Sequence, residues 1–410
     1  MDFGALGIYI ALFLALYVEV FLLLNYFEHK PAQKSARTPN YFPSVSIIVP
    51  VWNEERTLAN TLRSLLALEY PKKKLEILIV NDGSTDATEH IAKEFAKKYA
   101  QVRLINKENG GKYTALNRGI TESKAELVGC LDADSFVLRD ALLEAVKKFE
   151  HEPETMALIP AMTVHQPRTM LEMMQAVEYT FGVFFKKMFD NLGALNVLPG
   201  PFSIYKREVF EKIGLFRPAH NTEDMEIAFR MQKYGLKISN AHTARVETSV
   251  PKTVRTLLKQ RVRWSQGFLQ NSWDYAYMYF NPRYGNFGLF TLPVGLVAFI
   301  SGLYVAGYLL YSILHTLTAR AIDRWLTEVP LQLSAPHLDW FYLNTSMMMF
   351  LVIATMSLML TAILLGKQIA QSKLGALSLL SYFLIFGFLA PLWLARAAWG
   401  AVRAKESQWR

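Results

Sequence analysis

Long apolar stretches constrain the fold of this chain more than any other feature. The run from Phe3 to Phe27 is almost wholly apolar, and the later stretches 286–319, 340–366 and 374–395 contain no charged residue. A helix needs about 20 mostly apolar residues to cross the hydrocarbon core of a bilayer. We therefore expect one membrane helix within residues 1–28 and three more within residues 286–398.

The first run is expected to be an uncleaved anchor. A signal peptide has a basic start and a shorter apolar core, whereas here only Asp2 precedes the run and the basic residues Lys30, Lys34 and Arg37 follow it. The positive-inside rule then predicts an N-terminus outside and a cytoplasmic domain after it. Four crossings would place the C-terminus outside, although the tail 399–410 is basic. Either the tail lies along the interface or one stretch does not cross fully.

The overall composition excludes several classes of protein. Of the 410 residues, 52% are hydrophobic and only 19% are charged, which excludes a disordered or low-complexity chain. The single cysteine, Cys130, excludes a disulfide framework and a cysteine-based zinc site. The net charge of +9 would suit nucleic acid, an anionic membrane or a phosphorylated substrate. Because the basic residues flank the apolar spans, a nucleic-acid partner is not expected.

Residues 44–284 have the pattern of a soluble α/β domain. Short apolar runs at 45–50, 76–80, 102–106 and 127–131 alternate with segments of helical spacing. This alternation predicts βαβ units and a parallel sheet, whose ligand lies beyond the carboxyl ends of the strands. No GxGxxG follows the first run and no GxxxxGK[ST] is present, so neither a dinucleotide site nor a P-loop is indicated.

Carboxylates follow two of these predicted strands. Asp132 and Asp134 come directly after 127–131, and oxygen ligands of this kind hold Mg²⁺ or Mn²⁺ against a substrate phosphate. The alternative is a turn aspartate followed by a helix cap. Asp82, in the turn sequence NDGSTD, could contact a nucleoside base or ribose, or simply belong to a loop before a helix.

Three further segments carry charged or aromatic groups that suit a phosphorylated ligand. Lys112 follows two glycines at a predicted helix start, where backbone and charge could meet a diphosphate; alternatively it is a solvated loop lysine. Asp224 opens another helix, as a general base or as ordinary dipole compensation. Gln260, Arg263 and Trp264 share one helical face. With Lys259 and Arg261 beside them, that helix could also be a basic one lying on the membrane.

In this order, the segments resemble the membrane-embedded family 2 glycosyltransferases, which include cellulose, chitin, hyaluronan and poly-N-acetylglucosamine synthases. The matching segments are VSIIVPVWNEE (45–55), VNDGSTD (80–86), NGGKYTALNRG (109–119), LDADS (131–135), LPGPFSIYKREVFEKIG (198–214), NTEDMEIAFRMQKYG (221–235) and QRVRW (260–264). One departure is Trp52, where the family usually has tyrosine.

The resemblance implies a GT-A fold, Rossmann-like with a mixed sheet, that binds a UDP-sugar and Mg²⁺ or Mn²⁺. Asp82 would contact the uridine, and Asp132 would hold both nucleotide and metal, with Asp134 the closer metal ligand. Lys112 and Arg263 would bind the diphosphate. Asp224 would be the catalytic base. The acceptor would be bound by Gln260, Trp264 and Glu223.

The expected function is that of an inverting, processive β-glycosyltransferase. UDP-N-acetylglucosamine is the first expected donor and UDP-glucose the second, and the membrane helices would form a channel for the polymer. Expected partners are the donor, a glycan or lipid-linked acceptor, the bilayer and accessory secretion subunits. Two alternatives remain: transfer of one sugar to a membrane lipid, and a catalytically silent membrane subunit that binds nucleotide-sugar or scaffolds partners.

Overall fold

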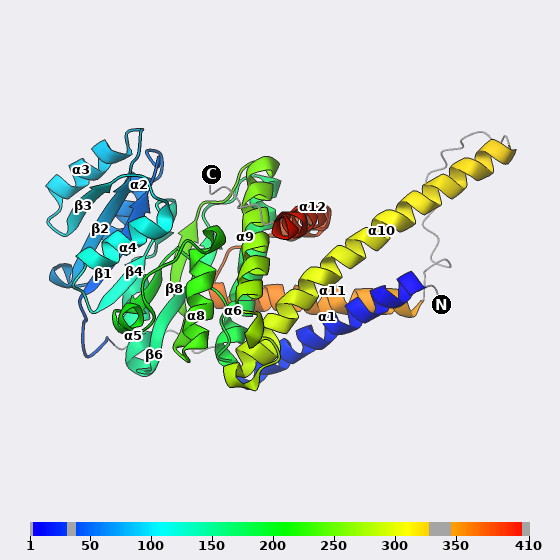
Figure 1. Cartoon of the computed structure of the whole chain (residues 1–410), viewed down its shortest axis with the longest axis horizontal. Helices are drawn as coiled ribbons and strands as arrows, with labels where there is room; N and C mark the ends of the chain where they lie inside the picture. The colour runs from blue at the N-terminus through cyan, green and yellow to red at the C-terminus, as the bar shows by residue number, and fades with distance from the viewer. Residues whose placement is uncertain (1–2, 31–37, 328–345, 404–410) are drawn as a thin grey trace.

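The chain folds into an α/β domain from which long apolar helices extend (Figure 1). The computed structural model describes residues 3–30, 38–327 and 346–403. Eight strands form one sheet in the order β3-β2-β1-β4-β7-β6-β8-β5. Their bounds are β1 (Val45–Val51), β2 (Leu75–Asp82), β3 (Val102–Lys107), β4 (Leu127–Cys130), β5 (Ser135–Val137), β6 (Thr155–Val164), β7 (Ser203–Lys206) and β8 (Lys237–Thr248).

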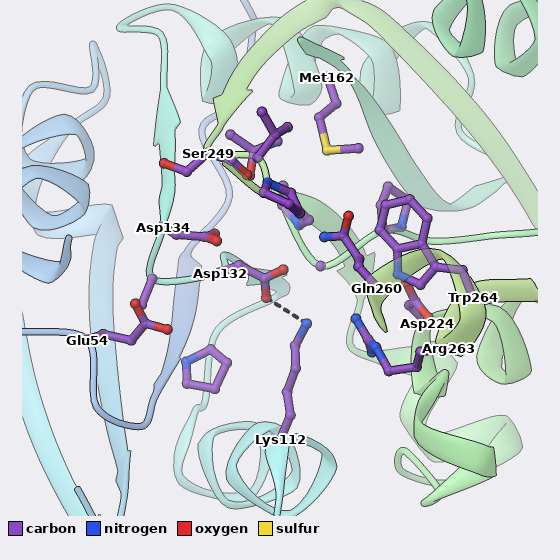
Figure 2. Close-up of a pocket in the computed structure, with 18 of the residues that line it drawn as sticks. Glu54, Lys112, Asp132, Asp134, Met162, Asp224, Ser249, Gln260, Arg263 and Trp264 are labelled. Carbon is purple, nitrogen blue, oxygen red and sulfur yellow. Dashed lines mark hydrogen bonds and ion pairs between the residues drawn. The ribbon is translucent and has the colours of Figure 1, made fainter. Parts of the chain in front are cut away.

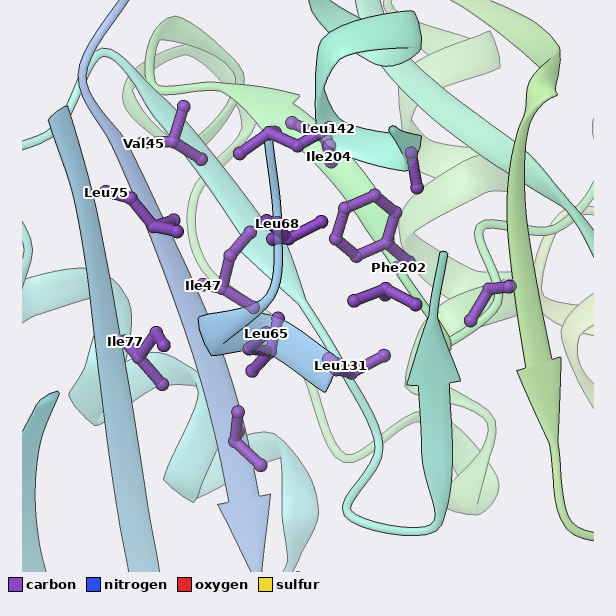
Figure 3. Packing of buried hydrophobic residues seen from close by; sticks show 14 of the residues in the cluster. Val45, Ile47, Leu65, Leu68, Leu75, Ile77, Leu131, Leu142, Phe202 and Ile204 are labelled. Atoms are coloured by element: carbon purple, nitrogen blue, oxygen red, sulfur yellow. The ribbon is translucent and has the colours of Figure 1, made fainter. Parts of the chain in front are cut away.

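The first half of the sheet is parallel, as the alternation of strands and helices predicts. β1 pairs in parallel with both β2 and β4, and β2 pairs in parallel with β3. The connecting helices are α2 (Leu58–Leu66), α3 (Thr88–Lys98) and α4 (Lys112–Glu122). Successive strand residues enter opposite hydrophobic clusters, Ile47 on one face and Ile48 on the other, and both are fully buried. Helices cover both faces of such a sheet, which explains the unbroken apolar runs. Figure 3 shows the cluster on the Ile47 face, to which Leu65 of α2 also belongs.

The second half of the sheet is mixed, which the strand–helix alternation alone does not predict. β7 runs antiparallel to β4 and β6, while β8 is parallel to β6 and antiparallel to β5. The intervening helices are α5 (Ala141–His151), α6 (Met170–Asn191), α7 (Glu208–Ile213), α8 (Glu223–Lys233) and α9 (Val254–Asp274). This mixed sheet agrees with the GT-A fold that the motifs imply.

Four of the described helices are long and apolar enough to cross a membrane. They are α1 (Phe3–Glu28), α10 (Leu292–Thr327), α11 (Met347–Ala370) and α12 (Ala376–Val402). α10 follows a π-helical turn at Phe287–Thr291. It continues beyond the uncharged stretch 286–319 and includes Arg320 and Arg324. α12 continues into the segment 399–410 that the sequence suggested as a tail. Residues 340–345 and 404–410 lie outside the described residues.

The apolar helices and the domain share a core. Leu22 of α1 and Ala362 of α11 are buried in one cluster with Phe184 of α6. Asn191 of α6 donates a hydrogen bond of 2.9 Å to Asn25 of α1. At Gly366 of α11, a Cβ atom would lie 2.4 Å from the carbonyl oxygen of Thr180 in α6. Through these contacts, α6 attaches the α/β domain to the apolar helices α1 and α11.

Candidate active site

A cavity of about 570 Å³ opens where the carboxyl ends of the central strands meet α9 (Figure 2). Its lining combines the β1 loop, the segment after β4, the turn before β7, the start of α8 and one face of α9. It brings together all but one of the residues predicted to form the site, namely Lys112, Asp132, Asp134, Glu223, Asp224, Gln260, Arg263 and Trp264. The exception is Asp82.

An ion-pair cluster lies inside this cavity. The Lys112 Nζ is 2.6 Å from a carboxylate oxygen of Asp132 and 3.4 Å from one of Glu223. Burial alone would lower the pKa of Lys112, but the nearby carboxylates of Asp132, Glu223 and Asp224 raise it above its ordinary value. Lys112 therefore stays protonated and can meet a diphosphate. A Cβ at Gly200 would lie 2.5 Å from both partners of the Lys112–Asp132 pair, so a side chain at this position would displace the pair.

Asp82 does not line the cavity, but it organises the loop that carries Lys112. It is only 2% exposed, its carboxylate forms an ion pair with Lys107, and it accepts hydrogen bonds from the backbone N–H groups of Gly110 (3.0 Å) and Gly111 (2.8 Å). These N–H groups were candidates for a diphosphate contact, but Asp82 already occupies them. Of this loop, only Lys112 lines the cavity.

The position of Asp224 depends on an unusual backbone before α8. Three successive residues, Ala219, His220 and Asn221, have positive φ angles of 40–60°, which L-residues adopt at a cost in energy. Arg263 Nη1 donates to the carbonyl oxygen of Asn221 at 2.9 Å, and Asn271 of α9 donates to the Thr222 hydroxyl at 2.9 Å. α9 therefore holds the turn that presents Asp224.

The electrostatic surroundings of Asp224 suit a proton acceptor. Burial, with the neighbouring charge of Glu223, raises the pKa of Asp224 from 3.8 to about 6, although Lys112 and Arg263 oppose the rise. A carboxylate with this pKa is ionised at neutral pH and is a stronger base than an ordinary aspartate. This is the combination that general base catalysis needs.

Arg261 is a residue whose role the sequence reasoning missed. Its position next to Lys259 suggested a charge facing the membrane surface, but its side chain is buried, with 3% exposed. It donates to Gln260 (2.9 Å) and to Glu178 of α6 (2.8 Å), and its guanidinium lies 4.3 Å from the ring centroid of Trp264. Arg261 thus fixes two predicted acceptor residues. Its partner Glu178 is far away in sequence, so no local signal identified this contact.

Other residues of the cavity also escaped the motif analysis. Met162 of β6 and Tyr179 of α6 line it, as do residues 249–251 after β8, because distant strands and helices meet there. Lys186 of α6 lies close enough to be influenced by Asp224. Burial lowers the pKa of Lys186 to about 8, and Asp224 counteracts part of this shift. α6 has mixed polarity, and the spacing of its residues in the sequence does not single out Tyr179 or Lys186.

Asp132 and Asp134 fit a divalent cation only as part of its coordination shell. Both line the cavity, and the Ser135 hydroxyl donates to Asp134 Oδ1 at 3.2 Å. No group of three or more His, Cys, Asp or Glu side chains suited to hold a metal ion occurs among the described residues. Two carboxylates that leave positions for phosphate oxygens and water are typical of Mg²⁺ sites in nucleotide-dependent enzymes. The donor set therefore fits a cation that is bound together with a diphosphate.

Comparison with known proteins finds relatives among the glycosyltransferases. The model of the glycosyl transferase family 2 matches residues 46–214. Poly-β-1,6-N-acetyl-D-glucosamine synthases from Staphylococcus epidermidis are 31% identical over 285 residues, 68% of this chain and 66% of that protein, and, in strain RP62A, 30% identical over 322 residues, 76% of each chain. A synthase of the same name from Staphylococcus aureus is 30% identical over 272 residues, 65% of this chain and 66% of that protein.

One solved structure is similar over almost the whole chain. It is a mannosyltransferase from Pyrobaculum calidifontis, in complex with GDP-mannose and Mn²⁺. It covers 97% of this chain and 99% of its own, with a TM-score of 0.64 and 22% identity. At this identity the similarity establishes the fold.

Proposed function

Because this chain belongs to the membrane-embedded, processive glycosyltransferases of family 2, we propose that it extends a β-linked polysaccharide from UDP-N-acetylglucosamine. The observation that carries this proposal is the cavity in which Asp224, with its raised pKa, lies together with Lys112, Arg263 and the Asp132/Asp134 pair. The relatives named as poly-β-1,6-N-acetyl-D-glucosamine synthases support N-acetylglucosamine as the donor sugar.

The proposed reaction follows from the positions of the carboxylate of Asp224 and of the cationic side chains of Lys112 and Arg263. A hydroxyl of the acceptor attacks the anomeric carbon, the bond from that carbon to the UDP oxygen breaks on the opposite face, and Asp224 takes the hydroxyl proton. A single in-line displacement inverts the configuration of this carbon. Lys112 and Arg263 balance the negative charge that develops on the departing diphosphate.

Asp134 and Asp132 would hold a divalent cation, Mg²⁺ or Mn²⁺, which neutralises part of the diphosphate charge when bound. The Mn²⁺ of the mannosyltransferase structure supports this choice. Before the donor arrives, Lys112 compensates the charge of Asp132 at 2.6 Å. The lysine therefore keeps the carboxylates from repelling each other and from repelling the incoming nucleotide.

Asp82 is proposed to contact the uridine. Its carboxylate already accepts from three donors, Lys107, Gly110 and Gly111. A carboxylate has about four acceptor positions, so one is left for the N–H of a uracil ring. Because the same side chain orders the loop before Lys112, base recognition and diphosphate binding would be connected through one residue.

The acceptor is proposed to lie on the side of the cavity formed by α9. Trp264 offers an aromatic face for a sugar ring, and Gln260 and Glu223 offer hydrogen-bonding groups beside it. Arg261 restrains Trp264 and Gln260 from behind. A restrained acceptor site next to Asp224 suits the repeated addition of sugars to one glycan.

The catalytic domain is proposed to face the cytoplasm, with the N-terminus outside. This orientation rests on the basic residues after α1, Lys30, Lys34 and Arg37, by the positive-inside rule. UDP-sugars are cytoplasmic, so the domain would meet its donor there. The polymer would leave through the apolar helices, with accessory secretion subunits as partners.

The deciding experiment uses purified membranes that contain the chain, a panel of UDP-sugars, and Mg²⁺ or Mn²⁺. We expect UDP release and a polymer with UDP-N-acetylglucosamine, and neither from an Asp224→Asn variant. A product with one sugar on a lipid, identified by its mass, would replace the polymer proposal. Absence of UDP release with every donor, in correctly inserted protein, would favour the silent subunit.

A further inference from the structure

α12 differs in direction from the other three candidate membrane helices. In Figure 1, α1, α10 and α11 extend away from the α/β domain, whereas α12 is seen end-on and runs across them. α9 also runs across the direction of α1 and α11, at the end of the domain from which these helices extend. α12 packs against both α9 and α6. By length and composition α12 could cross a membrane, but its direction is that of a helix in the membrane plane.

The link that precedes α12 and the last turn of α12 both contact the catalytic domain. Just before the helix, Arg245 of β8 donates to Gln371 at 2.9 Å, and the hydroxyls of Thr180 and Ser372 lie 3.3 Å apart. In its last turn, a Cβ at Gly400 would lie 2.8 Å from the side chain of Gln266 in α9. A helix of 27 residues is about 40 Å long. A crossing helix that begins at the domain would end about that far from it.

The exposed side of α12 suits a lipid surface. The exposed residues Leu377, Leu380, Leu384, Phe388 and Leu392 recur at intervals of three or four and form one apolar face. Toward its end the same face carries the exposed Arg396 and then Trp399, with the Arg403 guanidinium 4.2 Å from the Trp399 ring. Tryptophan and arginine together are typical of the boundary between acyl chains and headgroups. α12 contains no acidic residue that an anionic headgroup would repel.

We propose that α12 is an interfacial helix that lies in the membrane plane on α6 and α9, with its apolar face against the acyl chains of the bilayer. α1, α10 and α11 are then the three described helices that cross. The end of α12, with Arg396 and Arg403, then lies on the same side of the membrane as the catalytic domain, which resolves the conflict with four crossings. The proposal is independent of the donor sugar.

Single cysteines test the sidedness directly. They are introduced in the full-length chain at Lys98 in α3, at Ser334 between α10 and α11, and at Ser407 after α12; the native Cys130 is buried and the unmodified chain measures its background. Inside-out and right-side-out vesicles are treated with a charged maleimide. We expect Ser407→Cys to be labelled in the same vesicles as Lys98→Cys and in the opposite ones from Ser334→Cys. Labelling of Ser407→Cys together with Ser334→Cys overturns the proposal.

Spin labels test the orientation of α12 itself. Labels at Leu377, Leu384 and Leu392 lie on its exposed face with their ends 15 positions apart, and labels at Phe350 and Leu364, 14 positions apart on α11, are the crossing control. We expect one common membrane depth along α12, whereas the two α11 labels differ by about 20 Å along the helix axis. Depths along α12 that change as steeply as those along α11 overturn the proposal. Both readouts are independent of activity, so failure of the proposed reaction leaves them interpretable.

Discussion

At the scale of single residues, the raised pKa of Asp224 leads to a prediction about pH. Its pKa of about 6 means that the base is protonated, and inactive, below that pH. kcat/KM should therefore rise with pH to a plateau above about 7, with a midpoint near 6 instead of the usual value near 4. Initial rates of UDP release between pH 4.5 and 8.5 measure the midpoint.

The same profile in a Glu223→Gln variant is the matched control. The charge of Glu223 raises the pKa of Asp224, so its removal should move the midpoint to lower pH, whatever happens to the maximal rate. An unchanged midpoint would mean that another group controls the acid limb.

The carboxylate of Asp134 leads to a prediction about metal dependence. An Asp134→Ala variant should bind UDP in the presence of Mg²⁺ or Mn²⁺ at least roughly tenfold more weakly, since loss of even an outer-shell partner typically costs that much. Calorimetry with and without EDTA measures this, with Glu94→Ala, an exposed carboxylate on α3, as the control. If wild type and Asp134→Ala bind UDP equally and both respond to EDTA, the metal is held elsewhere.

At the scale of helices and strands, the contact between α9 and α6 is predicted to control the acceptor side of the reaction. An Arg261→Met variant leaves Glu178 without its partner and releases Gln260 and Trp264. Because 25% of the Glu178 side chain is exposed, loss of its partner should cost less than the roughly 3 kcal/mol typical of a fully buried pair. We expect polymer synthesis to fall more than the slow hydrolysis of UDP-sugar, with Arg255→Met, exposed on the same helix, as control. Equal loss of both activities would make Arg261 purely structural.

The elements that sequence reasoning could find are those with local signals. The parallel strands β1 to β4 and the start of α4 at Lys112 follow from apolar runs and helical spacing. The antiparallel β7 and the three-residue β5 depend on partners far away in sequence, and no periodicity specifies them. The same holds for the site. Asp132 and Asp134 directly follow a predicted strand, so their place in the site could be predicted. The role of Arg261 depends on its contact with Glu178, and the role of Asp82 depends on its hydrogen bonds with Gly110 and Gly111.

At the scale of the whole molecule, the domain and the apolar helices behave as one packed body. α6 belongs to the α/β domain by sequence, yet it shares a buried cluster with α1 and α11. It also carries Tyr179, which lines the cavity, beside Thr180, which contacts α11. Membrane packing and the shape of the active site therefore depend on the same helix. The apolar stretches alone predict long membrane helices but not this contact.

This leads to a prediction for Gly366 of α11. A Gly366→Ala variant places a Cβ atom 2.4 Å from the Thr180 carbonyl oxygen, a backbone atom that cannot move without shifting α6. Overpacking of this kind costs typically about 1–3 kcal/mol, which exceeds the roughly 0.5–1 kcal/mol that alanine gains over glycine within a helix. We expect a lower thermal midpoint of the detergent-solubilised protein, together with reduced UDP release. The matched control is Gly307→Ala in α10, where the added Cβ would meet no atom within 4 Å beyond the neighbouring backbone of its own helix, so that helix propensity alone should act. If both variants are equally stable and active, α11 and α6 are not rigidly packed, and the catalytic domain works independently of the helices that anchor it.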